Sequence, residues 1–491
     1  MIVASAAALD LDASDLDALS ANLYEVEREL IPYGLHVLGQ PLPEAMRAQM
    51  IAAGADPSLS SDNPELGALI HALDAGFVRP APGGDVLRNP KALPTGRNIH
   101  GFDPFRIPGS FAMAQGLAQA DEVIARHTAS GAAFPETLAM VLWGTDNLKS
   151  EGTQIAQVLA LIGAHPRFDG YGRLAGAELI ALDDLGRPRI DVIVTLSGIF
   201  RDLLPLQTRM IAEAAWLAAT ADEPLDRNAV RRHALAYAER TGCDLETAAL
   251  RVFSNAEGAY GANVNLLIDD GAWSDPDEIA EVFERQKGYA YGRTGTPARQ
   301  ADLFKAALAG VDLAYQNLDS VELGVTDIDH YVDALGGISR SITRARGSAA
   351  PVYIVDATQG ATKVRTLSEQ VELETRTRML NPLWYEAMLK HGFEGVRNIE
   401  AHVTNTLGWS ATTGDVSPWV YQRISETYVL DDAMRERLAT LNPKASARVA
   451  NRLIEASDRH FWSPDAATLA ALHAASDDLE DRLEGITAVA A

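Results

Sequence analysis

The stretch TLAMVLWGTDNLKSEGTQIAQVLALIG (residues 137–163) sets the expected architecture of this chain. Its first seven residues form a short apolar run, which is typical of strands buried on both faces of a parallel sheet. After a polar loop, Ile155, Val158, Leu159 and Ile162 repeat at helical spacing, and a glycine follows as a natural C-cap. The stretch therefore predicts a buried strand, a charged loop and a helix.

Further apolar runs extend this pattern along the chain. Residues 177–182, 190–198 and 349–358 are predicted strands, and residues 200–219 are a predicted helix. Strands that alternate with helices favour an open sheet covered by helices. We predict an α/β fold with an open, mostly parallel sheet and flanking helices, plus helical N-terminal and C-terminal segments.

Three segments are expected from the change in pattern along the chain. Residues 1–128 are a helical segment with a long Pro/Gly loop, residues 129–360 an α/β core with crevice loops, and residues 361–491 a mainly helical C-terminal region. The Pro/Gly loop, residues 77–110, contains six prolines. Ordered loops of this length are usually functional, so we expect it to carry site residues.

The composition excludes several classes of function. The chain has 67 acidic and 42 basic residues, a formal net charge of −25, which argues against nucleic acid or an anionic membrane as a partner. No apolar run approaches the roughly 20 residues of a membrane span, and the N-terminus lacks the basic start of a signal peptide. The single cysteine, Cys243, excludes an internal disulfide framework and a multi-thiolate metal site. A cytoplasmic enzyme fits this composition, and so does an acidic scaffold protein.

Common nucleotide and hydrolase motifs do not fit. There is no Gly-Lys dipeptide and hence no P-loop, and neither G-x-S-x-G nor H-E-x-x-H occurs. GYGRLA (residues 170–175) matches G-x-G-x-x-A but follows a helix and precedes a strand, the reverse of the dinucleotide-binding order. We expect no ATP hydrolysis by this chain.

Four loops instead combine acids, amides and basic residues. They are residues 95–104, 144–152, 196–202 and 315–331. Each lies beyond a predicted strand or in the Pro/Gly loop, and ligand crevices form at the carboxyl ends of parallel strands. We expect the four loops to converge on one cleft.

Several long motifs resemble one enzyme family. They include ALPTGRNIHGFDP, VLWGTDNLKSEGTQIAQVLALIG, VTLSGIFRDLLPLQ, SNAEGAYGANVN, AYQNLDSVELGVTDIDHY and NTLGWSATTGDVSPWVY. Together they resemble the C-terminal part of the large, porphyrin-binding (H) subunit of magnesium chelatase, for which the cobalt chelatase large subunit is the sister family. Family members are much longer, so we expect a split subunit, a short paralogue or a fragment.

The resemblance implies insertion of Mg²⁺, as substrate, into protoporphyrin IX in chlorophyll or bacteriochlorophyll biosynthesis. It also implies ATPase and bridging partner subunits that hydrolyse the ATP, and a separate chain could carry the missing N-terminal portion. Two alternatives stay open: a cobalt chelatase large subunit, and a non-catalytic tetrapyrrole-binding paralogue.

The chemistry of metal insertion suggests roles for residues in these loops. Mg²⁺ prefers carboxylate ligands, whereas a neutral imidazole is the better acceptor of pyrrole protons. The catalytic candidates are His100, His330, Asp146 and Lys149. The metal-handling candidates are Asp319, Glu322, Asp327 and Asp329. The porphyrin-binding candidates are Arg97, Arg201 and again Lys149 for the propionates, Tyr260, Tyr315 and Tyr331 for the macrocycle face, and Gln316 and Asn317.

Overall fold

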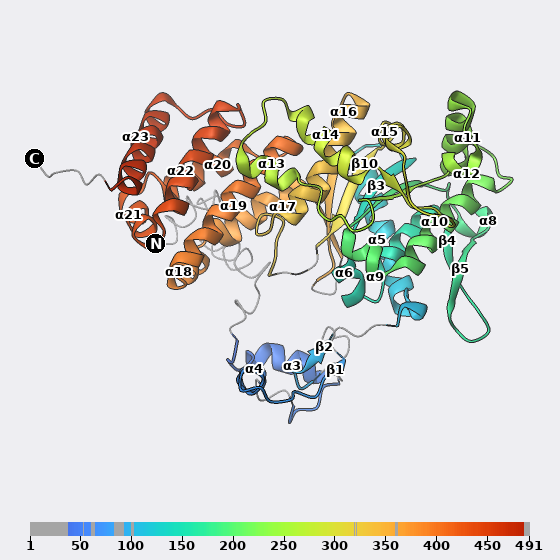
Figure 1. The fold of residues 1–491 in the computed structure, drawn as a ribbon, viewed down its shortest axis with the longest axis horizontal. Coiled ribbons are helices and arrows are strands. Elements are labelled where there is room, and N and C mark those ends of the chain that lie inside the picture. Colours follow the sequence, from blue (N-terminus) through green and yellow to red (C-terminus); the bar gives the residue numbers. More distant parts are fainter. Residues whose placement is uncertain are drawn as a thin grey trace, which may run out of the picture.

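The computed structural model describes residues 38–52, 54–59, 64–82, 93–99, 103–318, 320, 322–358 and 362–485. They form an α/β body, a row of C-terminal helices beside it and a small N-terminal lobe below it (Figure 1). No helix among the described residues is both long enough and apolar enough to cross a bilayer.

An eight-stranded sheet organises the α/β body in the order β12-β11-β10-β3-β6-β7-β8-β9. The neighbours from β11 to β7 pair in parallel, and β12, β8 and β9 join antiparallel at the two edges. The strands are β3 (Thr137–Leu142), β6 (Asp191–Leu196), β7 (Val252–Ser254), β8 (Tyr289–Ala290), β9 (Ala298–Arg299), β10 (Leu313–Asn317), β11 (Val352–Asp356) and β12 (Lys363–Thr366). The predicted fold class is confirmed.

The central strands are buried on both faces. Every residue of β3 and β6 is buried, as the apolar run after Pro135 predicts. Met140 of β3 pairs with Val194 of β6 on one side and with Tyr315 of β10 on the other. Alternate residues of these strands enter two separate cores, one on each face of the sheet.

Helices cover both faces of the sheet. One core packs β3 against α5 (Ser110–Ala129), α7 (Thr153–Ile162) and α10 (Pro205–Thr220). The other packs β3 against α14 (Pro276–Lys287), α15 (Ala301–Leu308) and α16 (Gly337–Arg346). The other helices of the body are α6 (Gly144–Lys149), α8 (Leu182–Leu185), α9 (Gly198–Leu203), α11 (Ala229–Thr241), α12 (Leu245–Ala248) and α13 (Val264–Asp270).

One predicted strand lies outside the main sheet. Residues 177–182 were expected in the parallel sheet, but β5 (Leu174–Leu179) instead pairs antiparallel with β4 (Ala164–Phe168) in a separate hairpin. Gly163 ends α7 in the left-handed conformation, so the chain turns directly into β4 and forms a local pair. This local pairing takes the strand out of the parallel sheet, where the sequence pattern placed it.

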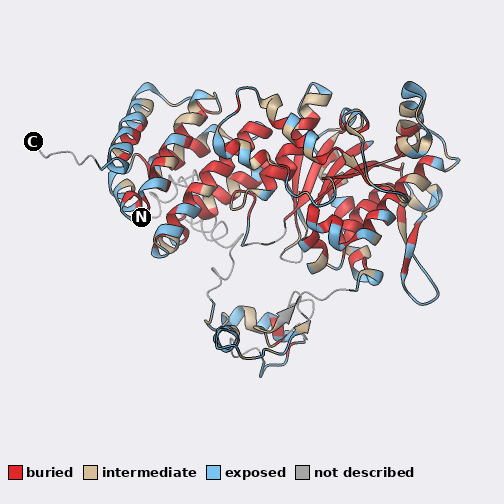
Figure 2. Cartoon of the chain, in the orientation of Figure 1, coloured by how far each residue is buried: buried red, intermediate tan, exposed pale blue. Residues whose placement is uncertain are grey.

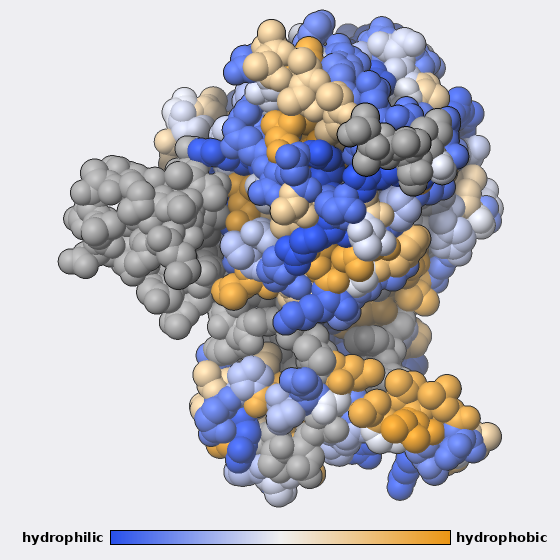
Figure 3. All heavy atoms as spheres, turned by 90° about the vertical axis from the view of Figure 1, so that its left-hand side faces the viewer, coloured by the Kyte–Doolittle hydropathy of each residue, from blue (hydrophilic) through white to orange (hydrophobic). Residues whose placement is uncertain are grey.

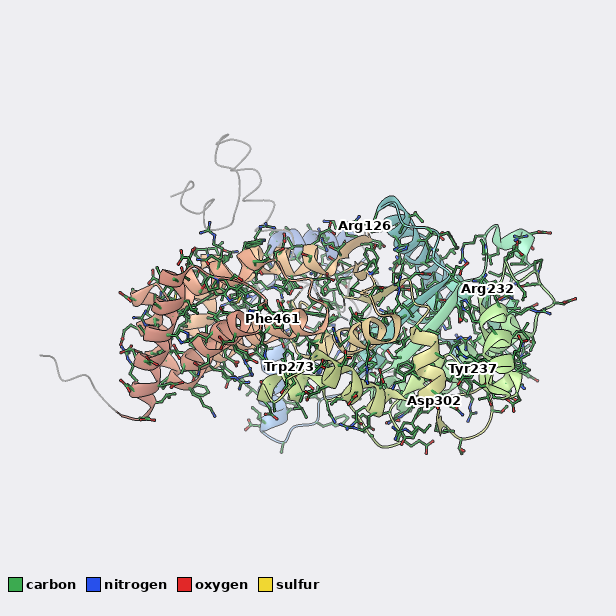
Figure 4. All side chains as sticks on the ribbon, turned by 90° about the horizontal axis from the view of Figure 1, so that it is seen from above. Arg126, Arg232, Tyr237, Trp273, Asp302 and Phe461 are labelled. Atoms are coloured by element: carbon green, nitrogen blue, oxygen red, sulfur yellow. The ribbon has the colours of Figure 1, made fainter. Side chains whose placement is uncertain are left out.

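The C-terminal helices share a core with the body. They are α17 (Leu367–Glu374), α18 (Pro382–Lys390), α19 (Phe393–Thr412), α20 (Pro418–Tyr428), α21 (Asp432–Leu441), α22 (Pro443–Asp458) and α23 (Ala466–Leu483). Buried residues run without a break from the sheet into this region (Figure 2). Trp273 and Phe461 lie beside each other at the junction (Figure 4), with 6.5 Å between ring centroids and 19° between planes.

The N-terminal lobe contains α3 (Glu44–Ala52) and α4 (Glu65–Leu73). A short parallel pair, β1 (Ala81–Pro82) and β2 (Asn98–Ile99), completes it. Residues 1–37 of the predicted helical segment lie outside the described residues. The predicted segment boundaries at residues 128 and 360 stay predictions. The first of them falls within α5, which ends at Ala129.

A buried ion pair joins two strands at the amino end of the sheet. Arg251 Nε donates to Asp191 Oδ1 at 2.6 Å, and both side chains are almost fully buried. Burial opposes ionisation of Asp191, but Arg251 and His233 outweigh it and hold the pKa of this carboxyl below its usual value. Its contribution to stability is therefore present at neutral pH and is lost as pH falls through the folded-state pKa.

We predict that Asp191→Asn lowers the free energy of unfolding by about 3 kcal/mol at pH 7, because it leaves the buried Arg251 charge unpaired. The matched control is Asp183→Asn, whose carboxylate is 98% exposed and lies 3.6 Å from Arg227; we expect a change within about 0.5 kcal/mol. Urea denaturation measures both. Equal stability of the two variants would contradict the assignment.

Candidate functional site

The carboxyl ends of β3 and β10 lie where the order of connections reverses. From β3 the chain continues to β6 on one side, and from β10 it continues to β11 on the other. In open α/β sheets ligands bind beyond such a reversal, because the loops after the two strands diverge. Figure 1 shows β3 and β10 side by side at the middle of the sheet. The candidate site is therefore expected beyond these two strands.

Two rings from the two loops stack at this point. Trp143 directly follows β3, and His330 lies in the loop after β10. Their ring centroids are 5.2 Å apart and their planes differ by 14°. The His330 side chain is 60% exposed, so the imidazole rests on the indole and still meets solvent.

A carboxylate orients this imidazole. Asp329 Oδ1 lies 3.0 Å from His330 Nδ1, and Asn265 Nδ2 donates to Asp329 Oδ2 at 2.5 Å. With its proton on Nδ1 facing Asp329, the neutral imidazole presents Nε2 as its basic atom. The arrangement can therefore accept a proton at Nε2 and stabilise the resulting imidazolium.

The two groups shift each other's ionisation in opposite directions. The hydrogen bond and charge of Asp329 outweigh partial burial and raise the pKa of His330. The bond from His330, with that from Asn265, lowers the pKa of Asp329. The pair thus holds a carboxylate beside an imidazole whose proton affinity is increased, which suits a general base.

Two further carboxylates hold this region: Glu374 fastens the loop that carries Asp329 and His330, and Asp333 fastens the end of that loop to the chain between β7 and α13. Glu374 accepts hydrogen bonds from the backbone N–H groups of Val325 and Thr326, at 2.8 Å each. Asp333, in a π-helical segment (Val332–Gly336), accepts from the N–H groups of Ala262 and Val264, at 2.7 and 2.8 Å. π-Helical turns are rare in proteins, and those that do occur often lie at functional sites.

The loop after β3 places Asp146 and Lys149 on α6. Asp146 is buried and Lys149 is exposed. Thr145 Oγ1 donates to Asp146 Oδ1 at 3.3 Å. Helix α6 packs against α9, the helix after β6. Two of the predicted loops, residues 144–152 and 196–202, therefore do lie together at the carboxyl end of the sheet.

Arg201, expected to pair with porphyrin propionates, is already engaged. Its Nε donates to Asp202 at 2.7 Å, and its Nη1 donates to the carbonyls of Ala256 and Ala259 at 2.7 and 2.9 Å. Tyr260, which is exposed, lies beneath the guanidinium and donates to Asp202. Because these contacts bury Arg201, it fastens the loop after β7 and offers no open surface to a propionate.

Four predicted porphyrin contacts lie in the interior instead. Tyr315, Gln316, Asn317 and Tyr331 are all buried, and Tyr315 has no exposed surface. Asn317 Nδ2 donates to Gln119 of α5 at 3.2 Å. The sequence expectation is corrected here, because Leu313–Asn317 is a central strand buried between the two cores and Tyr331 packs into one of these cores.

The metal-handling candidates do not form a joint site. Among the described residues no three His, Cys, Asp or Glu side chains lie close enough to hold a metal ion. Glu322 is exposed, and Asp329 pairs with His330. Asp327 contacts the buried Arg378 and His402, so an ion pair satisfies its carboxylate.

Three candidates lie on or beside undescribed parts of the chain. His100 and Asp319 are outside the described residues. Arg97 is in the N-terminal lobe, where its Nε donates to the carbonyl of Pro94 at 3.4 Å. The convergence of loop 95–104 with the other three stays a prediction.

Sequence reasoning missed Trp143, Asn265 and Lys287. Trp143 ends an apolar run and was assigned to the strand, although a Trp at the carboxyl end of a strand can signal a crevice wall. Lys287 Nζ donates to Leu196 O at 3.0 Å and to Asn255 Oδ1 at 2.8 Å, and burial lowers its pKa to about 8. No local pattern marks Asn265 or Lys287, since their partners are distant in sequence.

We predict that Asp329→Asn lowers the pKa of His330 toward its ordinary value, because it removes the carboxylate that favours the imidazolium. NMR titration of the imidazole measures the shift. Asp327→Asn is the control, since Asp327 contacts His402 and Arg378 and is not among the groups that shift His330. An unchanged pKa in Asp329→Asn would contradict the pairing.

Comparison with known proteins agrees with this architecture. The family model described as CobN/Magnesium Chelatase matches residues 48–469. The H subunit of magnesium chelatase from Rhodobacter capsulatus is 59% identical over 490 residues, which cover 98% of this chain and 41% of that protein. The chloroplastic magnesium-chelatase subunit ChlH of Oryza sativa subsp. indica is 44% identical over 87% of this chain and 31% of its own length.

A solved structure shows the same fold. The catalytic subunit of cobaltochelatase from Mycobacterium tuberculosis superposes with a TM-score of 0.82 and 32% identity, over 97% of this chain and 42% of that one. This chain spans less than half the length of the relatives it matches. It belongs to the CobN/magnesium chelatase family and resembles the C-terminal part of the magnesium chelatase H subunit.

Proposed function

We propose that this chain is the part of a magnesium chelatase large subunit at which protons leave protoporphyrin IX as Mg²⁺ enters. Identity of 59% to the magnesium chelatase H subunits of two bacteria supports magnesium, against 32% to the aerobic cobaltochelatase subunit CobN of Sinorhizobium. The product would serve chlorophyll or bacteriochlorophyll biosynthesis in the cytoplasm.

The observation that carries this proposal is the Asp329–His330 pair resting on Trp143 at the sheet's reversal point. Insertion of a divalent cation releases two pyrrole N–H protons. His330 Nε2 accepts one proton from a pyrrole nitrogen, Asp329 stabilises the imidazolium, and the exposed ring passes the proton to solvent before taking the second. Trp143 supports the ring at a fixed angle.

Energy for the reaction comes from partners in this proposal. Mg²⁺ releases its water ligands reluctantly, so insertion requires an external source of work. The chain has no Gly-Lys dipeptide and hence no P-loop. Partner ATPase and bridging proteins hydrolyse the ATP and drive the large subunit through the insertion step.

The remaining roles rest on exposed residues. Glu322 is an exposed carboxylate after β10 and suits transient handling of Mg²⁺. Lys149, exposed at the end of α6, suits pairing with a propionate, and Tyr260 offers an exposed ring. The roles expected from the sequence are kept for the other candidates, namely catalysis for Asp146 and His100, metal handling for Asp319 and propionate binding for Arg97.

We predict that His330→Ala lowers the rate of magnesium insertion at least about tenfold while protoporphyrin affinity stays unchanged, since proton transfer acts on the barrier. The assay uses this chain with the rest of the large subunit and the ATPase partners supplied. His473→Ala, an exposed histidine on α23, is the control. Unchanged insertion in a folded His330→Ala variant would remove His330 from the mechanism.

The same reconstituted complex tests the choice of metal. We predict insertion of Mg²⁺ and no comparable insertion of Co²⁺, measured by the absorbance of the metalloporphyrin. Preferred insertion of Co²⁺ would favour the cobalt chelatase alternative. Porphyrin binding without insertion of either metal would favour a tetrapyrrole carrier.

A further inference from the structure

The described residues of the N-terminal lobe form a small core. Among its described residues the buried apolar side chains are Met50, Ala55 and Leu93, with Leu42 and Met46 packed against them. A cluster of this size supplies little hydrophobic stabilisation by itself. The described part of the lobe therefore gains little stability from burial of its own apolar side chains.

Helix α4 turns an apolar face away from this core. Leu66, Leu69, Ile70 and Leu73 recur at i, i+3, i+4 and i+7, the spacing of a helix that faces a hydrophobic core. All four are exposed, and α4 buries none of its residues. Phe77, four residues further on, is 81% exposed. We call these five residues the α4 face.

The α4 face is large for a surface without a partner. Figure 3 shows a broad hydrophobic patch on the lower lobe, and exposed apolar side chains in a cluster of this kind mark interaction sites. Scattered single apolar residues would need no explanation. Four on one helical stripe, with Phe77 just beyond the end of the helix, indicate that a second surface packs there.

We propose that the α4 face docks the portion of the large subunit that lies outside the region matched by this chain. The matched region is only 41% of the related Rhodobacter capsulatus protein. Because the match is to the C-terminal part, the remaining portion of that relative precedes the matched region. In this proposal that portion supplies the apolar surface that covers the α4 face.

Charge disfavours a second copy of this chain as the occupant. Each chain carries a formal net charge of −25, so two copies repel each other at neutral pH. The α4 face consists of apolar side chains, and helix α4 carries one acidic residue, Glu65, one histidine, His71, and no lysine or arginine. An apolar surface is therefore its complement, as expected for contact within one subunit.

Photo-crosslinking in the complete Rhodobacter capsulatus relative tests this proposal. A benzoylphenylalanine replaces the residue aligned with Phe77, and a control probe replaces the residue aligned with Leu383, which is 69% exposed on α18. We expect the Phe77 probe to crosslink to peptides that precede the matched region, at a yield at least about tenfold above the Leu383 probe. Crosslinks only between two copies, only within the matched region, or to nothing would overturn the proposal.

Substitution in this chain provides the second readout. Leu73→Glu with Phe77→Glu should leave the melting temperature within about 2 °C, because both side chains are solvated here. It should also reduce binding of the dye ANS at least about twofold, whereas Leu383→Glu should not. A large fall in melting temperature would show that this chain covers the face itself, and would overturn the proposal.

Discussion

The reversal of connections between β3 and β10 is the constraint on which the site depends. Because β3 and β10 are parallel neighbours, Trp143 and the loop after Asn317 both lie at the carboxyl end of the sheet. The chain leaves β3 and β10 in opposite directions, so the two loops separate and leave space between them. His330, which comes from the loop after β10, enters that space and stacks on Trp143, which follows β3.

The loop after β10 keeps its shape through buried acids that accept backbone N–H groups. Glu374 holds this loop by accepting from Val325 and Thr326, whereas Asp333, which directly follows it, accepts from Ala262 and Val264 and so ties its end to the start of α13. Gly324 permits this arrangement, because a Cβ there would clash with the Glu374 carboxyl. These contacts leave Asp329 and His330 as the paired acid and base at the rim, which is what a positioned general base requires.

The sequence predicted the fold class and the end of the sheet at which the candidate site lies, but only part of the candidate site itself. Strands such as Thr137–Leu142 are evident because they are apolar and bounded by turn residues. The strand predicted at residues 177–182 was misplaced, since an apolar run does not reveal its partner strand. Tyr315 and Asp327 were misassigned for a similar reason. The direction of Tyr315 depends on strand register, and Asp327 finds Arg378 and His402, which no local pattern connects to it.

The central claim is that His330 acts as a base whose proton affinity is set by Asp329. The pH dependence of magnesium insertion by the reconstituted chelatase, with and without Asp329→Asn, tests it most directly. A base must be neutral, so activity falls as pH drops through the pKa of His330, which Asp329 raises. The account predicts that Asp329→Asn moves this acidic limb to lower pH. An acidic limb that stays in place in an active, folded Asp329→Asn variant would contradict it.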